Sequence, residues 1–169
     1  MEKLMKRVLE AKEERSEFQK EFIARHQLPI ISLTLNLPGG YELYSDWEKV
    51  FRIASKAINI AFEGSVKHKH RRIGKWGPEG FWAIGMSAML VKMKTVEIEN
   101  KHPMGRIFDI DVLDENGKVL SRRDLFMEGR QCMVCDDFAL LCYREKKHDY
   151  AEVRKSAEKI ILKGLIDNE

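Results

Sequence analysis

Residues 105–148 read GRIFDIDVLDENGKVLSRRDLFMEGRQCMVCDDFALLCYREKKH, and this stretch carries the strongest fold signals in the chain. An Asn-Gly dipeptide at 116–117 separates two strand-like segments, which is a strong signal for a β-hairpin. Helical periodicity follows, and Gly164 is expected to end the last helix. The segments predicted here are strands at 107–113 and 118–121 and helices at 136–146 and 149–163.

Upstream of this stretch, the spacing of apolar residues predicts further helices and strands. The first helix carries Arg15 and Gln19 on the same stripe as Phe18 and Phe22, and polar groups placed so are either paired in the core or directed into a site. Gly77-Pro78-Glu79-Gly80 is a turn signal. The predicted segments are a helix at 3–25, a strand at 28–37, a helix from 45 or 46 to 62, two short strands within 71–86, and a helix at 87–100 with Leu90, Met93 and Val96 inward.

Hairpins recur without regular β-α-β alternation, which predicts an α+β fold: a small, mostly antiparallel sheet with surrounding helices. The length of 169 residues suits a single domain, 1–169. A central sheet that bears an acidic pair is nucleotidyltransferase-like by analogy.

Bulk composition limits the functional classes. A net charge of +3 is too small to indicate nucleic acid binding, although residues 67–75 form a cationic run that could attract an acidic partner or be a solvated basic loop. No stretch is apolar enough to span a membrane, and the charged N-terminus is unlike a signal peptide. We therefore expect a cytoplasmic protein with no membrane or nucleic acid partner.

Asp109 and Asp111 form the first candidate site. Residues two apart in a strand point to the same face, so their carboxylates would converge, with Phe108 and Ile110 buried behind them. Two like charges this close need a cation between them, or one must take a proton. Mg²⁺ suits few carboxylates plus substrate phosphates, and it would support phosphoryl or nucleotidyl displacement. The alternative is a solvated strand face at a hairpin.

Cys132, Cys135, Cys142 and His148 form the second candidate site, with the spacing C-x2-C-x6-C-x5-H. A tight Cys-x2-Cys turn followed by two ligands on or beside a helix is typical of a zinc-knuckle-like element, here residues 132–148. Such a Zn²⁺ site would be closed and structural. The spacing is not a standard zinc-finger form, so free thiols, with Cys142 in the core, remain open.

Arginines surround the hairpin, and guanidinium groups bind phosphate with two parallel hydrogen bonds. Four acid–base candidates nearby are more typical of surface charge: Glu79, Glu97, Glu99 and His102. The phosphate-binding, dinucleotide and serine-hydrolase motifs are all missing, which disfavours kinase, hydride-transfer and serine-hydrolase chemistry. The arginines in question are Arg106, Arg122, Arg123, Arg130 and Arg144.

These motifs together resemble one family. The matching pieces are G-P-E-G at 77–80, H-P-M-G-R-I-F-D-I-D-V at 102–112, the N-G turn, S-R-R-D at 121–124, R-Q-C-x-x-C at 130–135, C-x-R-x-x-x-H at 142–148 and E-E-R-x-x-x-Q at 13–19. The chain is similar to the apo-citrate lyase phosphoribosyl-dephospho-CoA transferases, also called citrate lyase holo-acyl-carrier-protein synthases.

The resemblance implies a specific reaction. Triphosphoribosyl-dephospho-CoA would donate the prosthetic group to a serine of the citrate lyase acyl carrier protein, its gamma subunit, with release of pyrophosphate. Asp109 and Asp111 would bind Mg²⁺ and orient the serine hydroxyl. Positively charged and polar groups would hold the triphosphate and the donor: Arg106, Arg122, Arg123, Arg15, Gln19 and Lys92.

Two other functions fit the same residues. One is a zinc-stabilised module that binds RNA or an acidic protein through its basic face. The other is the equivalent transferase acting on the carrier subunit of malonate decarboxylase, although the cysteine and histidine pattern favours the citrate lyase family.

Overall fold

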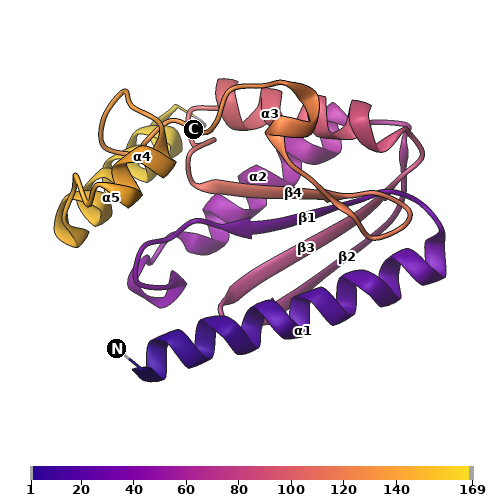
Figure 1. Cartoon of the computed structure of the whole chain (residues 1–169), viewed down its shortest axis with the longest axis horizontal. Coiled ribbons are helices and arrows are strands. Elements are labelled where there is room, and N and C mark those ends of the chain that lie inside the picture. The colour runs from indigo at the N-terminus through magenta and orange to yellow at the C-terminus, as the bar shows by residue number, and fades with distance from the viewer. Residues whose placement is uncertain (1, 168–169) are drawn as a thin grey trace.

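The computed structural model describes residues 2–167, with side chains from residue 5 onward. Helices and strands are mixed along the chain, which confirms the α+β prediction (Figure 1). The helices are α1 Glu2–His26, α2 Trp47–Ala61, α3 Ala88–Lys101, α4 Ala139–Arg144 and α5 Tyr150–Ile166. The strands are β1 Ile30–Leu35, β2 Val66–Gly74, β3 Gly77–Ile84, β4 Phe108–Leu113 and β5 Val119–Leu120, and single 3-10 turns lie at Tyr41–Leu43 and Arg122–Leu125.

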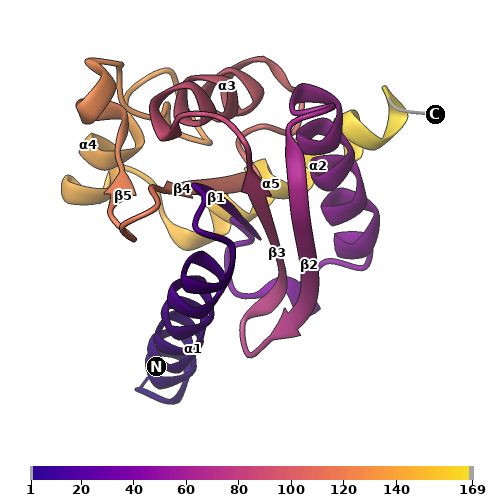
Figure 2. The ribbon, with the colours of Figure 1, turned by 90° about the vertical axis from the view of Figure 1, so that its right-hand side faces the viewer.

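The strands form one antiparallel sheet in the order β2-β3-β1-β4-β5. Figures 1 and 2 show α1 on one side of the sheet and α2 on the other. The main core lies on the α2 side, where Leu33 and Ile110 meet apolar residues of α2, α3 and α5. Within the described residues, no helix is both long and apolar enough to cross a bilayer.

The opposite face of the sheet, toward α1, is the polar face, and it carries Ser32, Thr34, Asp109 and Asp111 at alternate strand positions. Helix α1 packs on β1, β2 and β3 of this face, with Phe22 closing a second apolar cluster. The polar positions of β1 and β4 therefore lie beside α1, where Ser32 is buried and Thr34, Asp109 and Asp111 are half-buried, so this face is only partly solvated.

The turn prediction at residues 77–80 is wrong. These residues lie inside the fully buried strand β3, and the hairpin turns at residues 75–76 instead. The glycine at position 80 is required by packing, because a Cβ there would lie 2.6 Å from the ring of Trp82. The cationic run 67–75 is consequently not a loop but mostly the exposed edge strand β2.

Two details of the helices also differ from expectation. In α3, Leu90 and Met93 are exposed, and the inward face consists of Val91, Lys92, Thr95, Val96 and Glu99. Gly164 does not end α5, which continues to Ile166. Its role is packing, since a Cβ at Gly164 would lie 2.1 Å from Met104 Cγ.

Candidate functional site

Asp109 and Asp111 lie side by side on the polar face, as their spacing predicts. Thr34 of β1 lies opposite Asp109 of β4, and its hydroxyl donates to Asp109 Oδ2 at 3.1 Å. Burial, followed by the charge of Asp109, raises the pKa of Asp111 above its usual value. Across residues 5–167, no side chain makes a hydrogen bond or ion pair with the Asp111 carboxylate. The pair thus holds more negative charge than its own contacts neutralise.

The outer edge of β4 is bonded by side chains, because β5 pairs only with Val112 and Leu113. Arg130 Nη2 donates to the carbonyl of Phe108 at 2.7 Å. The Glu99 carboxylate accepts from the amide of Ile110 at 3.1 Å, and Lys92 Nζ donates to the carbonyl of Ile110 at 3.5 Å. These contacts place two cations and one acid directly beside the strand that carries the aspartates.

Glu99 and Arg122 form a buried ion pair with a separation of 2.7 Å, and their side chains are 5% and 12% exposed. Arg122 also donates to Asn100 Oδ1 at 3.1 Å. The surface-charge interpretation is therefore wrong for Glu99, although it holds for Glu97, which is exposed and pairs with Lys101. Burial lowers the pKa of Lys92, and the charges of Glu99 and Asp111 oppose that shift.

Glu79 is also buried, and it joins α1 to the sheet. Its carboxylate pairs with Arg15 at 3.1 Å and with Arg72 at 2.8 Å. Arg15, Glu79, Thr34 and Asp109 line a small cavity of about 160 Å³. Arg15 is thereby directed toward the acidic pair, as the sequence allowed.

Gln19 has a different position from Arg15. Its amide donates to the Ser32 hydroxyl at 2.9 Å, in the interior between α1 and β1. Ser32 lies opposite Asp111 in the sheet. Gln19, one helical turn after Arg15, therefore contacts a residue of β1 and does not line the small cavity that Arg15 lines.

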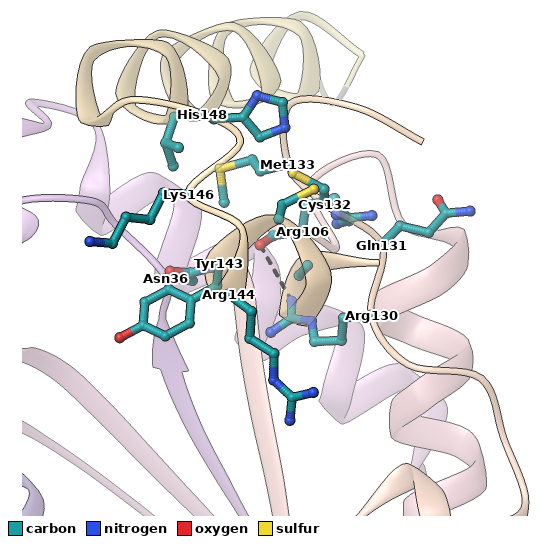
Figure 3. Close-up of a pocket in the computed structure, with 13 residues that line it drawn as sticks. Asn36, Arg106, Arg130, Gln131, Cys132, Met133, Tyr143, Arg144, Lys146 and His148 are labelled. Atoms are coloured by element: carbon teal, nitrogen blue, oxygen red, sulfur yellow. Dashed lines mark hydrogen bonds between the residues drawn. The ribbon is translucent and has the colours of Figure 1, made fainter. Parts of the chain in front are cut away.

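A cavity of about 700 Å³ lies next to the acidic pair. Figure 3 shows four of its cationic side chains, Arg106, Arg130, Arg144 and Lys146, together with Asn36. Asn36 also lines the small cavity that contains Asp109, so the two cavities are adjacent. Burial, followed by the charge of Arg130, lowers the pKa of Arg106. The crowded guanidinium groups make this cavity suitable for an anion.

A third cavity, of about 420 Å³, shares Arg106 and Arg130 with the large one and adds Arg122 and Glu99. Arg123 lines none of these cavities and is exposed. A phosphate bound in the two larger cavities would therefore contact Arg106, Arg122, Arg130 or Arg144 and not Arg123. Arg123 stays a prediction for the rim of the site.

The three cysteines and His148 come together at the wall of the large cavity. Their ligand atoms, one from each residue, all lie within 4.8 Å of one another. Cys142 is buried and the other three are half-buried. The sequence spacing thus corresponds to a real cluster.

Comparison with known proteins identifies the family. Residues 3–164 match the family described as apo-citrate lyase phosphoribosyl-dephospho-CoA transferase. Proteins of that name from Escherichia coli O9:H4 (strain HS) and Shigella boydii serotype 18 (strain CDC 3083-94 / BS512) are each 31% identical over 157 residues, which cover 91% of this chain and 86% of theirs. This chain belongs to that family of transferases.

The apo-citrate lyase phosphoribosyl-dephospho-CoA transferase match spans every residue of the acidic pair and its surroundings. Within H-P-M-G-R, Gly105 has a clear packing role. A Cβ at Gly105 would lie 2.1 Å from the carbonyl oxygen of Glu99, so only glycine lets the turn before β4 reach α3. That close approach sets Glu99 against Ile110.

Arg130 is the residue that sequence reasoning undervalued. The sequence placed it in the basic set but gave it no role, whereas the structure bonds it to Asp109 at 3.4 Å and to three backbone carbonyls. The signal was its position two residues before Cys132, at the start of the cysteine segment, since such a segment must be anchored to the rest of the fold. For Thr34, the alternation of polar and apolar residues in its strand already predicts a position on the polar face.

Proposed function

We propose that this protein transfers the phosphoribosyl-dephospho-CoA group to apo citrate lyase, onto a serine of its acyl carrier subunit. The donor is the triphosphoribosyl form, and pyrophosphate is released. Family membership supports the transfer and the acceptor. The arrangement of charges supports the chemistry, because acids and arginines meet where two cavities adjoin.

One observation carries the proposal. Arg130 contacts Asp109 at 3.4 Å and at the same time lines the large cavity. A triphosphate held in that cavity by Arg106 and Arg130 would present its phosphorus atoms to the acidic pair. The attacking group and the leaving group would then be stabilised from opposite sides.

The displacement balances simply. The serine Oγ bonds to the phosphorus next to the ribose and its hydroxyl proton passes to the Asp109 carboxylate, while the bond from that phosphorus to the bridging oxygen breaks and pyrophosphate leaves with the electron pair. Asp109, 45% exposed, is the carboxylate placed to accept the hydrogen bond of the serine hydroxyl. Arg106 and Arg130 neutralise the charge that develops on the departing oxygens.

Mg²⁺ fits the acidic pair. The Asp111 carboxylate is partly buried beside a second carboxylate, Asp109, and burial followed by that neighbouring charge raises its pKa; a bound cation would offset both effects. Asp109 and Asp111 would hold the ion, and when bound it would supply charge neutralisation for the phosphates. The charges of Lys92 and Arg15 oppose the rise in the pKa of Asp111, but neither residue forms an ion pair with it.

The test is a transfer assay with an intact-mass readout. The purified protein is incubated with Mg²⁺, triphosphoribosyl-dephospho-CoA and apo citrate lyase acyl carrier protein. We expect the carrier to gain the mass of the prosthetic group, with one pyrophosphate released per carrier. No gain with a folded enzyme and a competent carrier would refute the proposal, and transfer to the malonate decarboxylase carrier alone would change the acceptor.

Variants then test the site. Asp109→Asn should lower the rate by about 10²–10⁴-fold, the range for a lost proton acceptor. Arg130→Gln should also be severely impaired, whereas Arg52→Gln, an exposed arginine on α2, is the matched control and should retain full rate. Circular dichroism confirms that each variant is folded. An Asp109→Asn enzyme with normal rate would remove Asp109 from the chemistry.

A further inference from the structure

The segment from Arg130 to Asp149 has little of its own to keep it folded. Helix α4 has six residues, too short to be stable by itself in water. Large apolar side chains in the segment are exposed, with Leu140 at 51%, Leu141 at 45% and Tyr143 at 82%. Apart from α4, its regular pairing within the described residues is a single bridge between Gln131 and Phe138. Met133 packs against the main core and Cys142 is buried, but this is little apolar burial for a segment of this length.

The cysteine and histidine cluster lies at the centre of that segment. Cys135 Sγ is 3.5 Å from Cys142 Sγ and 3.2 Å from His148 Nε2. In tetrahedral zinc sites with Zn–S bonds of about 2.3 Å, neighbouring sulfurs lie about 3.8 Å apart, so the spacing here is close to that of a bound site. One ion would use all four groups, whereas a disulfide would use two thiols and leave the others without a role.

The surroundings of the cluster also suit a metal. The amide of Val134 donates to Cys132 Sγ at 3.4 Å, the kind of N–H contact that supports a coordinating thiolate. Asp137 pairs with Lys147, which ties the loop after Cys135 to the residue just before His148. Three thiolates and one imidazole fill all four positions, and that closed ligand set is characteristic of structural zinc rather than catalytic zinc.

We propose that Cys132, Cys135, Cys142 and His148 bind one zinc ion, which fixes residues 130–149 as the wall of the large cavity. The ligand set joins the loop after Arg130 to α4 and to the start of α5. Cys132, Cys142 and His148 themselves line the cavity, as Figure 3 shows for Cys132 and His148. Arg130, at the first residue of the segment, contacts Asp109. Zinc would therefore hold Arg130 and Arg144, the two cavity arginines of this segment, in place without touching a substrate.

The metal content of the full-length protein tests the site independently of activity. The protein is purified without a metal-binding tag, and zinc is measured by mass spectrometry of the metal. We expect one zinc per chain in the wild type, none or little in Cys142→Ser and His148→Gln, and one in His70→Gln, which changes a histidine of β2 outside the cluster. Less than 0.1 zinc per chain in the wild type after growth with zinc would overturn the proposal.

Cobalt provides a second measurement that does not depend on the folding of any variant. Replacement of zinc by Co²⁺ in the wild type should give the intense visible and near-ultraviolet absorption of tetrahedral cobalt thiolate, reversed by added zinc. A titration with no such absorption, or a Cys135–Cys142 disulfide found by peptide mass mapping, overturns the site. Chelation should also expose residues 130–149 to limited proteolysis while α2 and the sheet stay intact, and unchanged cleavage of the zinc-free protein would refute the structural role.

Discussion

Removal of the Glu99 carboxylate should destabilise the protein by about 3–4 kcal/mol, the cost of leaving one member of a buried ion pair alone. The value belongs near the lower end of the range because Arg122 keeps its bonds to Asn100 at 3.1 Å and to the Glu128 carbonyl at 3.4 Å. The Ile110 amide would lose its acceptor, which adds to the cost unless water enters from the adjacent cavity.

Urea unfolding followed by tryptophan fluorescence measures this effect. With a denaturant slope of about 2 kcal/mol per molar, Glu99→Ala should lower the midpoint by about 1.5–2 M. Glu99→Gln should lose less, because its side-chain oxygen still accepts from Ile110. The matched control is Glu97→Gln, two residues away on α3, whose exposed pair with Lys101 should be worth no more than about 0.5 kcal/mol.

The double variant Glu99→Ala/Arg122→Met separates the ion pair from packing. If the pair acts as a unit, the double variant is no less stable than Glu99→Ala, because no buried charge is left unpaired. Equal costs for Glu99→Ala and Glu97→Gln would refute the reasoning, since the two glutamates differ mainly in burial.

Three further outcomes follow from other contacts. Because its pKa is raised, Asp111 costs stability once the pH rises far enough to ionise it in the folded state, and this cost disappears at low pH where it is protonated in both states. In EDTA, Asp111→Asn should therefore be more stable than wild type at pH 7, and the difference in stability should narrow toward pH 4. A variant less stable than wild type at pH 7 contradicts this. Added Mg²⁺ should raise the melting temperature of the wild type and not of Asp111→Asn, and equal shifts would place the ion elsewhere. Gly164→Ala should cost about 1–3 kcal/mol despite better helix propensity, because its Cβ overlaps Met104, and thermal melts of Gly164→Ala in a Met104→Ala background should show a smaller effect.

The predictable parts of the fold were the segments whose signals are local. Alternation placed the strand Ile30–Leu35, and the Asn-Gly turn placed the hairpin around residues 114–117. Apolar spacing placed α1 and α2 to within a few residues. The G-P-E-G turn prediction failed because Gly80 is there for the ring of Trp82, a contact that its neighbours in sequence do not reveal.

The candidate site divides in the same way. The period of two in a strand put Asp109 and Asp111 on one face, and the cysteine spacing indicated a cluster, because both depend on residues close in the chain. Burial of Glu79 and Glu99 was not predictable, since charged residues are seldom buried unless a partner is present. Arg122, the partner of Glu99, lies 23 residues away in the chain, and Glu79 pairs both with Arg72, 7 residues away, and with Arg15, 64 residues away.

The sequence by itself therefore determined the family, the α+β class and the identity of the acidic pair, all of which rest on short-range patterns. Only the tertiary structure decided that β4 has an open edge, that Arg130 bonds this edge and Asp109 together, and that the cysteine segment walls a cavity. The physical reason is that an unpaired strand edge must find hydrogen bonds. Which distant side chains supply them depends on how the helices pack against the sheet.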